Sequence, residues 1–94
     1  MTERLYYTDS YLRSFDAEVV ARRSVDDGIE VVLSRSAFYP TSGGQPHDTG
    51  TLDGAEVVDV REEGDAVVHV VTRPVDGRVH GEIDWPRRFD HMQQ

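Results

Sequence analysis

Apolar and polar residues along this chain form short runs, and most of these runs predict β-strands. They are rich in valine and other β-branched residues, and clusters of Gly, Asp or Pro separate them. The run at residues 66–72, A-V-V-H-V-V-T, is apolar at almost every position, so we expect a strand that is buried on both faces. The runs together predict strands at residues 4–8, 15–23, 29–33, 48–52, 56–61, 66–72 and 79–83.

Residues 15–23, F-D-A-E-V-V-A-R-R, fit two structures. Their alternation and β-branched residues favour a strand, whereas Ala and Glu favour an amphipathic helix, which is the alternative. Turn signals at residues 26–28, 53–54, 63–65 and 74–77 complete the pattern. Short strands with a turn about every 8–12 residues are typical of a small antiparallel barrel or sandwich. We therefore expect a mainly β fold, a small antiparallel β-barrel over residues 1–84.

The end of the chain departs from this pattern. Trp85, Phe89 and Met92 are spaced as on one face of a helix, Asp84 can cap that helix, and Pro86 suits its first turn. About ten residues of helix are marginal in water unless something packs on them. We expect residues 85–94 to be the start of a short C-terminal helix.

The composition narrows the classes of function. Eighteen acidic residues face ten basic ones among 94 residues, a net charge of −8, and every basic residue is arginine. A protein that binds nucleic acid by itself usually presents a basic surface, so contact here would need a local patch or a partner domain. The chain has no cysteine, which excludes disulfides, cysteine nucleophiles and thiolate metal ligands within it.

The sequence carries no signal for a membrane or for export. Its apolar runs fall well short of the roughly 20 residues that a membrane span needs. Residues 1–4 lack the apolar core of a signal peptide. We therefore expect a cytoplasmic protein with no membrane partner.

The segment at residues 38–50, F-Y-P-T-S-G-G-Q-P-H-D-T-G, is the strongest candidate for function. It is long for a loop in so small a barrel, and long loops are often functional. Gly43 and Gly44 let the backbone approach a ligand closely, and hydroxyl, amide and imidazole groups cluster around them. The alternative is a conformationally demanding turn with polar decoration, and the spacing of a phosphate-binding loop is absent.

The four histidines predict no zinc site within the chain. We expect His69, which lies among valines, to be a core histidine, and His80 to lie on the surface or the barrel rim. His47 belongs to the loop and could bind a ligand, whereas His91 belongs to the terminal helix. A zinc site needs three or four converging ligands, and these side chains stand on separate elements.

A small basic cluster stands near the end of this acidic chain. It consists of Arg87, Arg88 and His91. The cluster could contact the phosphate backbone of a tRNA, or it could pair with acidic residues on neighbouring strands.

The loop at residues 38–50 and the segment at residues 81–94, G-E-I-D-W-P-R-R-F-D-H-M-Q-Q, together resemble the alanyl-tRNA editing family. The loop resembles the glycine-rich motif of that family, and the second segment resembles the approach to its catalytic helix. The family includes the editing domain of alanyl-tRNA synthetase and the free-standing AlaX-type proteins. Residues 1–15 and the variant Pro46-His47-Asp48 are more similar to the AlaX type.

This resemblance implies a translation-protein-like β-barrel that precedes a zinc-containing α/β editing domain. The pair hydrolyses the ester of tRNA(Ala) mischarged with serine or glycine, so the 3′ end of tRNA(Ala) is the expected partner. Backbone N–H groups and an amide can hold an ester carbonyl or a ribose without adding charge. The loop residues that match, and that would line the entrance of the editing pocket, are Thr41, Ser42, Gly43, Gly44 and Gln45.

The zinc ligands of the family are a His-x-x-x-His pair, expected just after Gln94, and a later Cys-x-x-x-His pair, and this sequence contains neither. We expect no catalytic residue or metal ligand in the chain, zinc in the longer family protein, and little activity of residues 1–94 alone. Residues 85–94 would then lead to an absent catalytic domain. The alternative is a non-catalytic barrel that binds RNA or a protein, including a second copy through residues 85–94.

Overall fold

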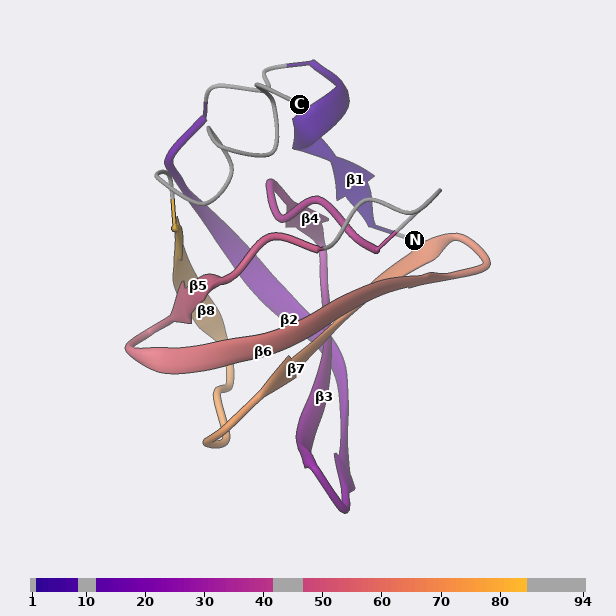
Figure 1. Cartoon of the computed structure of the whole chain (residues 1–94), viewed down its shortest axis with the longest axis vertical. Helices are drawn as coiled ribbons and strands as arrows, with labels where there is room; N and C mark the ends of the chain where they lie inside the picture. The colour runs from indigo at the N-terminus through magenta and orange to yellow at the C-terminus, as the bar shows by residue number, and fades with distance from the viewer. Residues whose placement is uncertain (1, 9–11, 42–46, 85–94) are drawn as a thin grey trace.

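The computed structural model describes residues 2–8, 12–41 and 47–84, and its central feature is a closed β-barrel (Figure 1). Six strands close the barrel in the order β2-β3-β7-β6-β5-β8, and every neighbouring pair is antiparallel. The predicted mainly β fold and small antiparallel barrel are confirmed. The barrel strands are β2 (Ser14–Val25), β3 (Gly28–Leu33), β5 (Gly50–Leu52), β6 (Ala55–Glu63), β7 (Ala66–Val71) and β8 (Arg78–Ile83).

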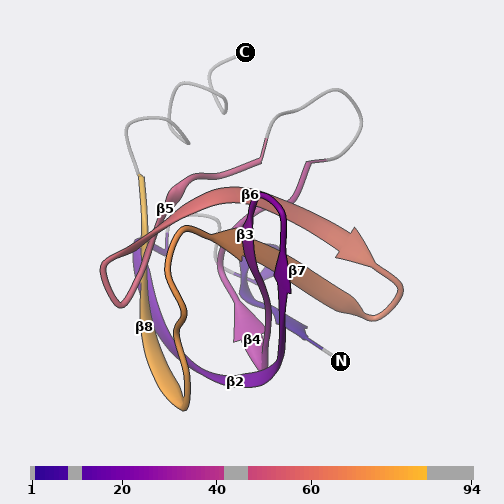
Figure 2. The same ribbon diagram turned by 90° about the horizontal axis from the view of Figure 1, so that it is seen from below.

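The longest strand, β2, pairs with a different neighbour in each half. Residues 14–18 pair with β8, and residues 19–25 pair with β3. The register shifts between Val19 and Ala21, and the side chain of Val20 at this point is 58% exposed. Such a bulge bends a strand, which lets β2 curve around the barrel (Figure 2). The strand predicted at residues 15–23 is therefore confirmed, and the alternative helix is wrong.

Tight turns join neighbouring strands where the sequence carries turn signals. Asp53 and Gly54, between β5 and β6, have φ angles of 49° and 82°. Two successive positive φ angles match the twist of the flanking strands. Gly64, between β6 and β7, has a φ of 60°. The turns predicted at residues 53–54 and 63–65 are thus confirmed.

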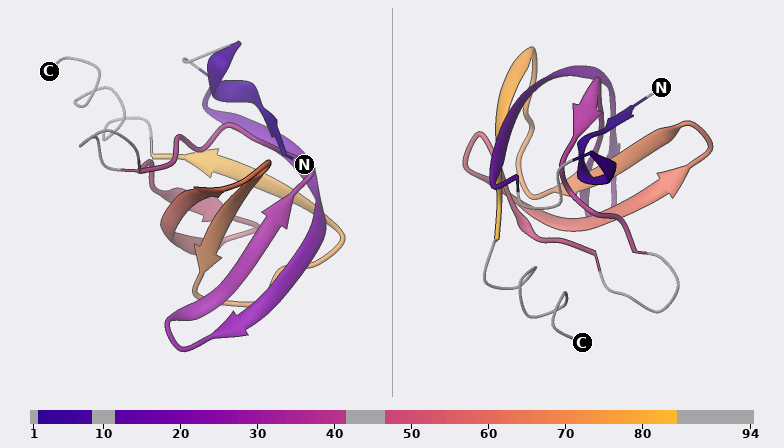
Figure 3. Two further views of the ribbon diagram at one scale, coloured as in Figure 1. Left: turned by 90° about the vertical axis from the view of Figure 1, so that its right-hand side faces the viewer. Right: turned by 90° about the horizontal axis from the view of Figure 1, so that it is seen from above.

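The first predicted strand is wrong over most of its length. Only β1 (Glu3–Arg4) is extended, and it pairs in parallel with β4 (Arg35–Ser36), whereas Leu5–Tyr7 form the 3₁₀-helix η1. Tyr6 is 5% exposed, and its ring centroid lies 5.0 Å from that of Tyr39. The turn places η1 over one end of the barrel (Figure 3), and burial of the Tyr6 ring accounts for it.

Inward-facing side chains of all six barrel strands fill the core. Gly81 shows how closely they pack, because a Cβ at this position would lie 2.6 Å from a carbon of the Phe15 ring. A glycine on β8 therefore makes room for an aromatic ring on β2. The core side chains of the strands are Phe15, Ala17, Val31, Leu33, Leu52, Ala55, Val57, Val60, Val67, Val71, Val79 and Ile83.

The strand β7 is buried on both faces, as predicted. His69 lies in the core, fully buried, whereas Val68 and Val70 on the opposite face are 4% and 5% exposed. Arg61 and Glu30, which form an ion pair, line the same shallow cleft as Val70. The methylene stems of arginines cover apolar surface well, so this ion pair shields an outer face made of valines.

The helix predicted from Trp85 lies outside the described residues. In the described ranges, no helix has the length and apolar character that crossing a lipid bilayer requires.

Candidate functional site

The glycine-rich loop follows β4 and returns to the barrel at β5. The strand predicted at residues 48–52 begins only at Gly50, because Asp48 and Thr49 belong to the base of the loop. Of the five loop residues expected at the entrance of the editing pocket, Thr41 is the one that the structure describes. The predicted site residues outside the described residues are Ser42, Gly43, Gly44, Gln45, Arg87, Arg88 and His91.

A reciprocal pair of hydrogen bonds between Tyr39 and Asp48 closes the base of the loop. The N–H of Tyr39 donates to Asp48 Oδ2 at 2.8 Å, and the N–H of Asp48 donates to the Tyr39 carbonyl at 2.9 Å. Asp48 is only 3% exposed, so its carboxylate needs such donors in place of water. This pair, the loop clamp, holds the two stems of the loop together.

The outgoing stem is also tied to the barrel wall. The N–H of Thr41 donates to the carbonyl of Val60 on β6 at 2.9 Å. Its hydroxyl lies 3.3 Å from His47 Nδ1, which in turn lies 3.7 Å from Asp59 Oδ1. His47, predicted as a possible ligand-binding group, stands on the returning stem. Its ring therefore lies between Thr41 on the outgoing stem and Asp59 on β6.

The last described residue lies beside the returning stem. The N–H of Asp84 donates to the Thr49 carbonyl at 2.7 Å, and the Thr49 hydroxyl donates to Asp84 Oδ2 at 3.4 Å. Gly50 pairs with Ile83, and a Cβ at Gly50 would lie 2.0 Å from the carbonyl oxygen of Glu82. Only glycine permits this approach, which places the base of the loop against the end of β8.

The loop begins at a side chain that is fixed in the core. Phe38 is fully buried, and its ring meets those of Phe15 and His69 edge to face, at centroid distances of 5.7 and 5.5 Å. Its N–H donates to Ser36 Oγ at 3.1 Å, and Ser36 Oγ lies 2.7 Å from His69 Nε2. His69 is a hydrogen-bonded core histidine, as predicted, and burial lowers its pKa to about 4.

Aromatic rings stand beside the outgoing stem. Tyr6 contacts both Tyr7 and Tyr39, with ring centroids 4.7 and 5.0 Å apart. Burial raises the pKa of Tyr6 to about 12, with the carboxylate of Glu62 adding to the effect. Tyr7 is 70% exposed. The phenol of Tyr6 is therefore neutral at pH 7 and serves as packing for the loop.

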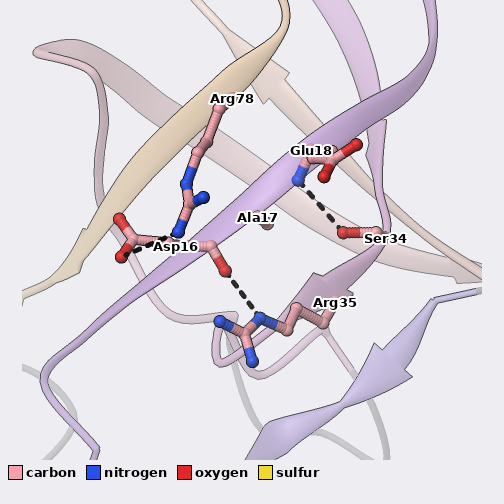
Figure 4. Close-up of a pocket in the computed structure, with 6 residues that line it drawn as sticks. All are labelled: Asp16, Ala17, Glu18, Ser34, Arg35 and Arg78. Atoms are coloured by element: carbon pink, nitrogen blue, oxygen red, sulfur yellow. Dashed lines mark hydrogen bonds and ion pairs between the residues drawn. The ribbon is translucent and has the colours of Figure 1, made fainter.

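A second polar cluster lies on the outer face of β2. Arg35 and Arg78 reach Asp16 from opposite sides of the strand (Figure 4): Arg35 Nε donates to the Asp16 carbonyl at 2.6 Å, and Arg78 Nη2 lies 3.8 Å from Asp16 Oδ2. His80 Nδ1 lies 2.9 Å from Asp16 Oδ1. The hydrogen bond between them raises the pKa of His80 and lowers that of Asp16. His80 is exposed, as predicted.

Sequence reasoning missed three residues that shape the site: Ser36, Asp48 and Tyr6. Asp48 stood inside the quoted motif but without a role, and a carboxylate between His47 and Thr49 resembles any exposed loop residue until its burial is known. Ser36 and Tyr6 carried no signal, because their partners lie far away in the sequence. Ser36 bonds His69, 33 residues away, and the ring of Tyr6 contacts that of Tyr39 on the loop stem.

The described residues do not form a metal centre. Within residues 2–8, 12–41 and 47–84, no three histidine, aspartate or glutamate side chains converge as ligands of one ion. The chain has no cysteine to supply a thiolate.

The chain is a small β-barrel of the class related to tRNA synthetases, since a family profile described as tRNA synthetases class II (A) matches residues 3–87. The chain belongs to the alanyl-tRNA editing family. It is 50% identical over 109 residues to the alanyl-tRNA editing protein AlaX-M of Methanosarcina acetivorans, an alignment that covers 99% of this chain and 43% of that protein.

Alanine–tRNA ligases match the same region. The ligase of Pyrobaculum neutrophilum is 48% identical over 99 residues, and that of Pyrococcus furiosus is 46% identical over 100 residues. Each alignment covers 98% of this chain but only 11% and 10% of the two ligases. The chain therefore spans less than half the length of these relatives.

Proposed function

We propose that this chain is the N-terminal β-barrel of an alanyl-tRNA editing protein that hydrolyses tRNA(Ala) mischarged with serine or glycine. The barrel, residues 1–84, holds the glycine-rich loop beside the editing pocket, and residues 85–94 lead to the catalytic domain. The observation that carries this proposal is the loop clamp between Tyr39 and Asp48, next to Asp84. It presents the loop at the point where the chain leaves the barrel.

The loop contributes neutral hydrogen-bonding groups rather than charge. The residues at its centre offer backbone N–H groups, hydroxyls and one amide to the terminal ribose or the ester carbonyl of the charged tRNA. Fixed neutral donors stabilise charge that develops on an ester oxygen, because they need no reorganisation during the reaction. With a net charge of −8, the chain does not attract the tRNA backbone over long range. We assign the bulk of tRNA affinity to the remainder of the longer protein.

The hydrolytic chemistry belongs to that remainder as well. A zinc ion in the editing domain would activate the attacking water and polarise the ester, and its ligands would stand outside this chain. The barrel positions the 3′ end of the tRNA and forms part of the wall of the editing pocket. The chain alone is then inactive.

A deacylation assay tests the proposal. Serine-charged tRNA(Ala) is incubated with the 94-residue chain alone and with a longer editing protein that carries this barrel. We expect hydrolysis above background only with the longer protein. In that protein, Thr41→Val removes the stem hydroxyl, and we expect kcat/KM to fall by about tenfold, the effect of losing one positioned hydrogen bond.

Thr72→Val is the matched control. Thr72 is exposed and accepts a hydrogen bond from the N–H of Glu56 at the far end of β7, away from the loop. Equal losses in the two variants would contradict a role of the loop at the tRNA end. Binding of tRNA by the chain without any contribution to deacylation in the longer protein would favour the non-catalytic binding module instead.

A further inference from the structure

We propose that His69 is a positioning residue for the glycine-rich loop, acting through Ser36 on the backbone of Phe38. This inference rests on the proposed function of the loop at the tRNA end. His69 lies on β7 in the barrel core, and it touches neither the loop centre nor any substrate in the proposal. Its effect travels along a chain of three hydrogen bonds, the His69 relay, which runs from β3 through β7 and β4 to the first residue of the loop.

The direction of each hydrogen bond in the relay follows from its partners. The carbonyl of Val31 can only accept, so His69 Nδ1, 3.1 Å away, carries the proton. His69 Nε2 in the neutral ring then has a free lone pair and accepts the proton of the Ser36 hydroxyl at 2.7 Å. The Ser36 oxygen is left to accept the N–H of Phe38 at 3.1 Å. One arrangement of protons satisfies all three bonds.

Burial protects this arrangement. His69 and Ser36 are both fully buried, and burial keeps the imidazole neutral at pH 7. A buried imidazole or hydroxyl without partners is costly, so the relay has little freedom to rearrange. Protonation of His69 at Nε2 would remove the acceptor on which the Ser36 hydroxyl depends.

The relay ends where the loop begins. It fixes the backbone of Phe38, whose ring is wedged against the rings of His69 and Phe15. Tyr39, the next residue, forms the loop clamp with Asp48. The position of the loop stems is thus set by a hydrogen bond in the core, together with the clamp at the surface.

The need for a histidine here is not explained by packing alone. Its neighbours Val67 and Val71 on the same face of β7 are apolar and equally buried. An aliphatic residue at position 69 would fill the core without having to satisfy two ring nitrogens. It would also leave the Ser36 hydroxyl without its acceptor, and that hydroxyl is what holds the N–H of Phe38.

Two substitutions at position 69 separate positioning from packing. In His69→Gln the side-chain amide reaches the place of Nε2 and can still accept from Ser36. In His69→Asn the amide reaches only the place of Nδ1, so the bond to Val31 can survive while the bond to Ser36 is lost. Amide hydrogen exchange in the 94-residue chain should then be faster by about tenfold or more at Phe38, Tyr39 and Asp48 in the asparagine variant.

The remaining barrel amides should exchange alike in the two variants. Equal exchange at the loop stems in both variants, or loop exchange that only follows global stability, would overturn the proposal. Should His69→Asn fail to fold, Ser36→Ala breaks the relay with almost no change in volume. Its control is Ser34→Ala, which also removes a hydroxyl that accepts a backbone N–H, that of Glu18, but on the outer face of the barrel.

Deacylation by the longer editing protein then tests the link to function. We expect kcat/KM to fall by about tenfold in His69→Asn and Ser36→Ala, and to be retained in His69→Gln and Ser34→Ala. Faster amide exchange at the loop stems with unchanged kcat/KM would overturn the role of the loop at the tRNA end. Unchanged amide exchange at the loop stems would overturn the role of His69.

Discussion

Asp48 and Tyr39, nine residues apart, hold each other through two hydrogen bonds of 2.8 and 2.9 Å. One bond runs from backbone to side chain and the other from backbone to backbone. The two bonds thus resemble one pair of β-sheet hydrogen bonds, although neither residue belongs to a strand. They fix the two stems of a long polar loop.

Replacing Asp48 by alanine should loosen and destabilise this base. The N–H of Tyr39 would lose its acceptor, and leaving such a group unsatisfied costs about 2 kcal/mol. Asp48→Asn keeps an oxygen in place and should cost less. Urea denaturation followed by circular dichroism measures both free energies of unfolding, and equal values for the two variants would contradict the clamp.

Gly81→Ala should overpack the core between β8 and β2. The new Cβ would lie 2.6 Å from the Phe15 ring, so either the ring or the strand must shift. Overpacking of this kind costs about 2 kcal/mol. The double variant Gly81→Ala/Phe15→Leu should recover part of that loss relative to the sum of the single variants. Strict additivity in urea unfolding would show that the two residues do not compete for space.

The pair of Asp16 and His80 should stabilise the fold on the acidic side of neutrality. The pKa of His80 is raised above its ordinary 6.5 by the hydrogen bond with Asp16, so its contribution is complete below that value and disappears as pH rises through the raised pKa. The pKa of Asp16 is lowered below 3.8, so its own contribution disappears as pH falls through the lowered pKa.

The pair therefore acts between these two limits. Proton NMR of the His80 ring should show its pKa fall in Asp16→Asn. The loss of stability in that variant should be larger at about pH 5 than at about pH 8. A His80 pKa that does not respond to Asp16→Asn would show that the two side chains do not interact in solution.

His69 should produce the opposite dependence on pH. Its pKa is lowered by burial from 6.5 to about 4, so between these values the unfolded chain binds a proton that the folded chain does not. Stability therefore falls as pH drops from about 6.5 to about 4. The free energy of unfolding of the wild type relative to His69→Gln should fall over this range, whereas relative to His80→Gln it should stay level, because the contribution of His80 is already complete below its ordinary pKa of 6.5. A His69 ring that titrates near 6.5 by NMR would contradict its burial.

Much of the fold was predictable because its signals are local. Valine-rich runs predicted the barrel strands, and Asp-Gly signals predicted turns that need positive φ at Asp53 and Gly54. The strand at residues 4–8 failed because Leu5–Tyr7 are apolar enough for a strand, but the chain turns here as η1 and buries the ring of Tyr6. The glycine-rich loop was recognisable as a motif, yet nothing local showed which residues would hold its stems.

By itself, the sequence determined the six barrel strands, the turns, the long polar loop and the resemblance to the alanyl-tRNA editing family. Each of these depends on residues within a few positions of one another. Only the tertiary structure decided that Asp48 clamps Tyr39 and that His69 reaches Phe38 through Ser36. Those contacts join residues on different elements, and their distances depend on the order and register in which six strands close the barrel. Barrel closure is a property of the whole chain, so no segment carries it alone.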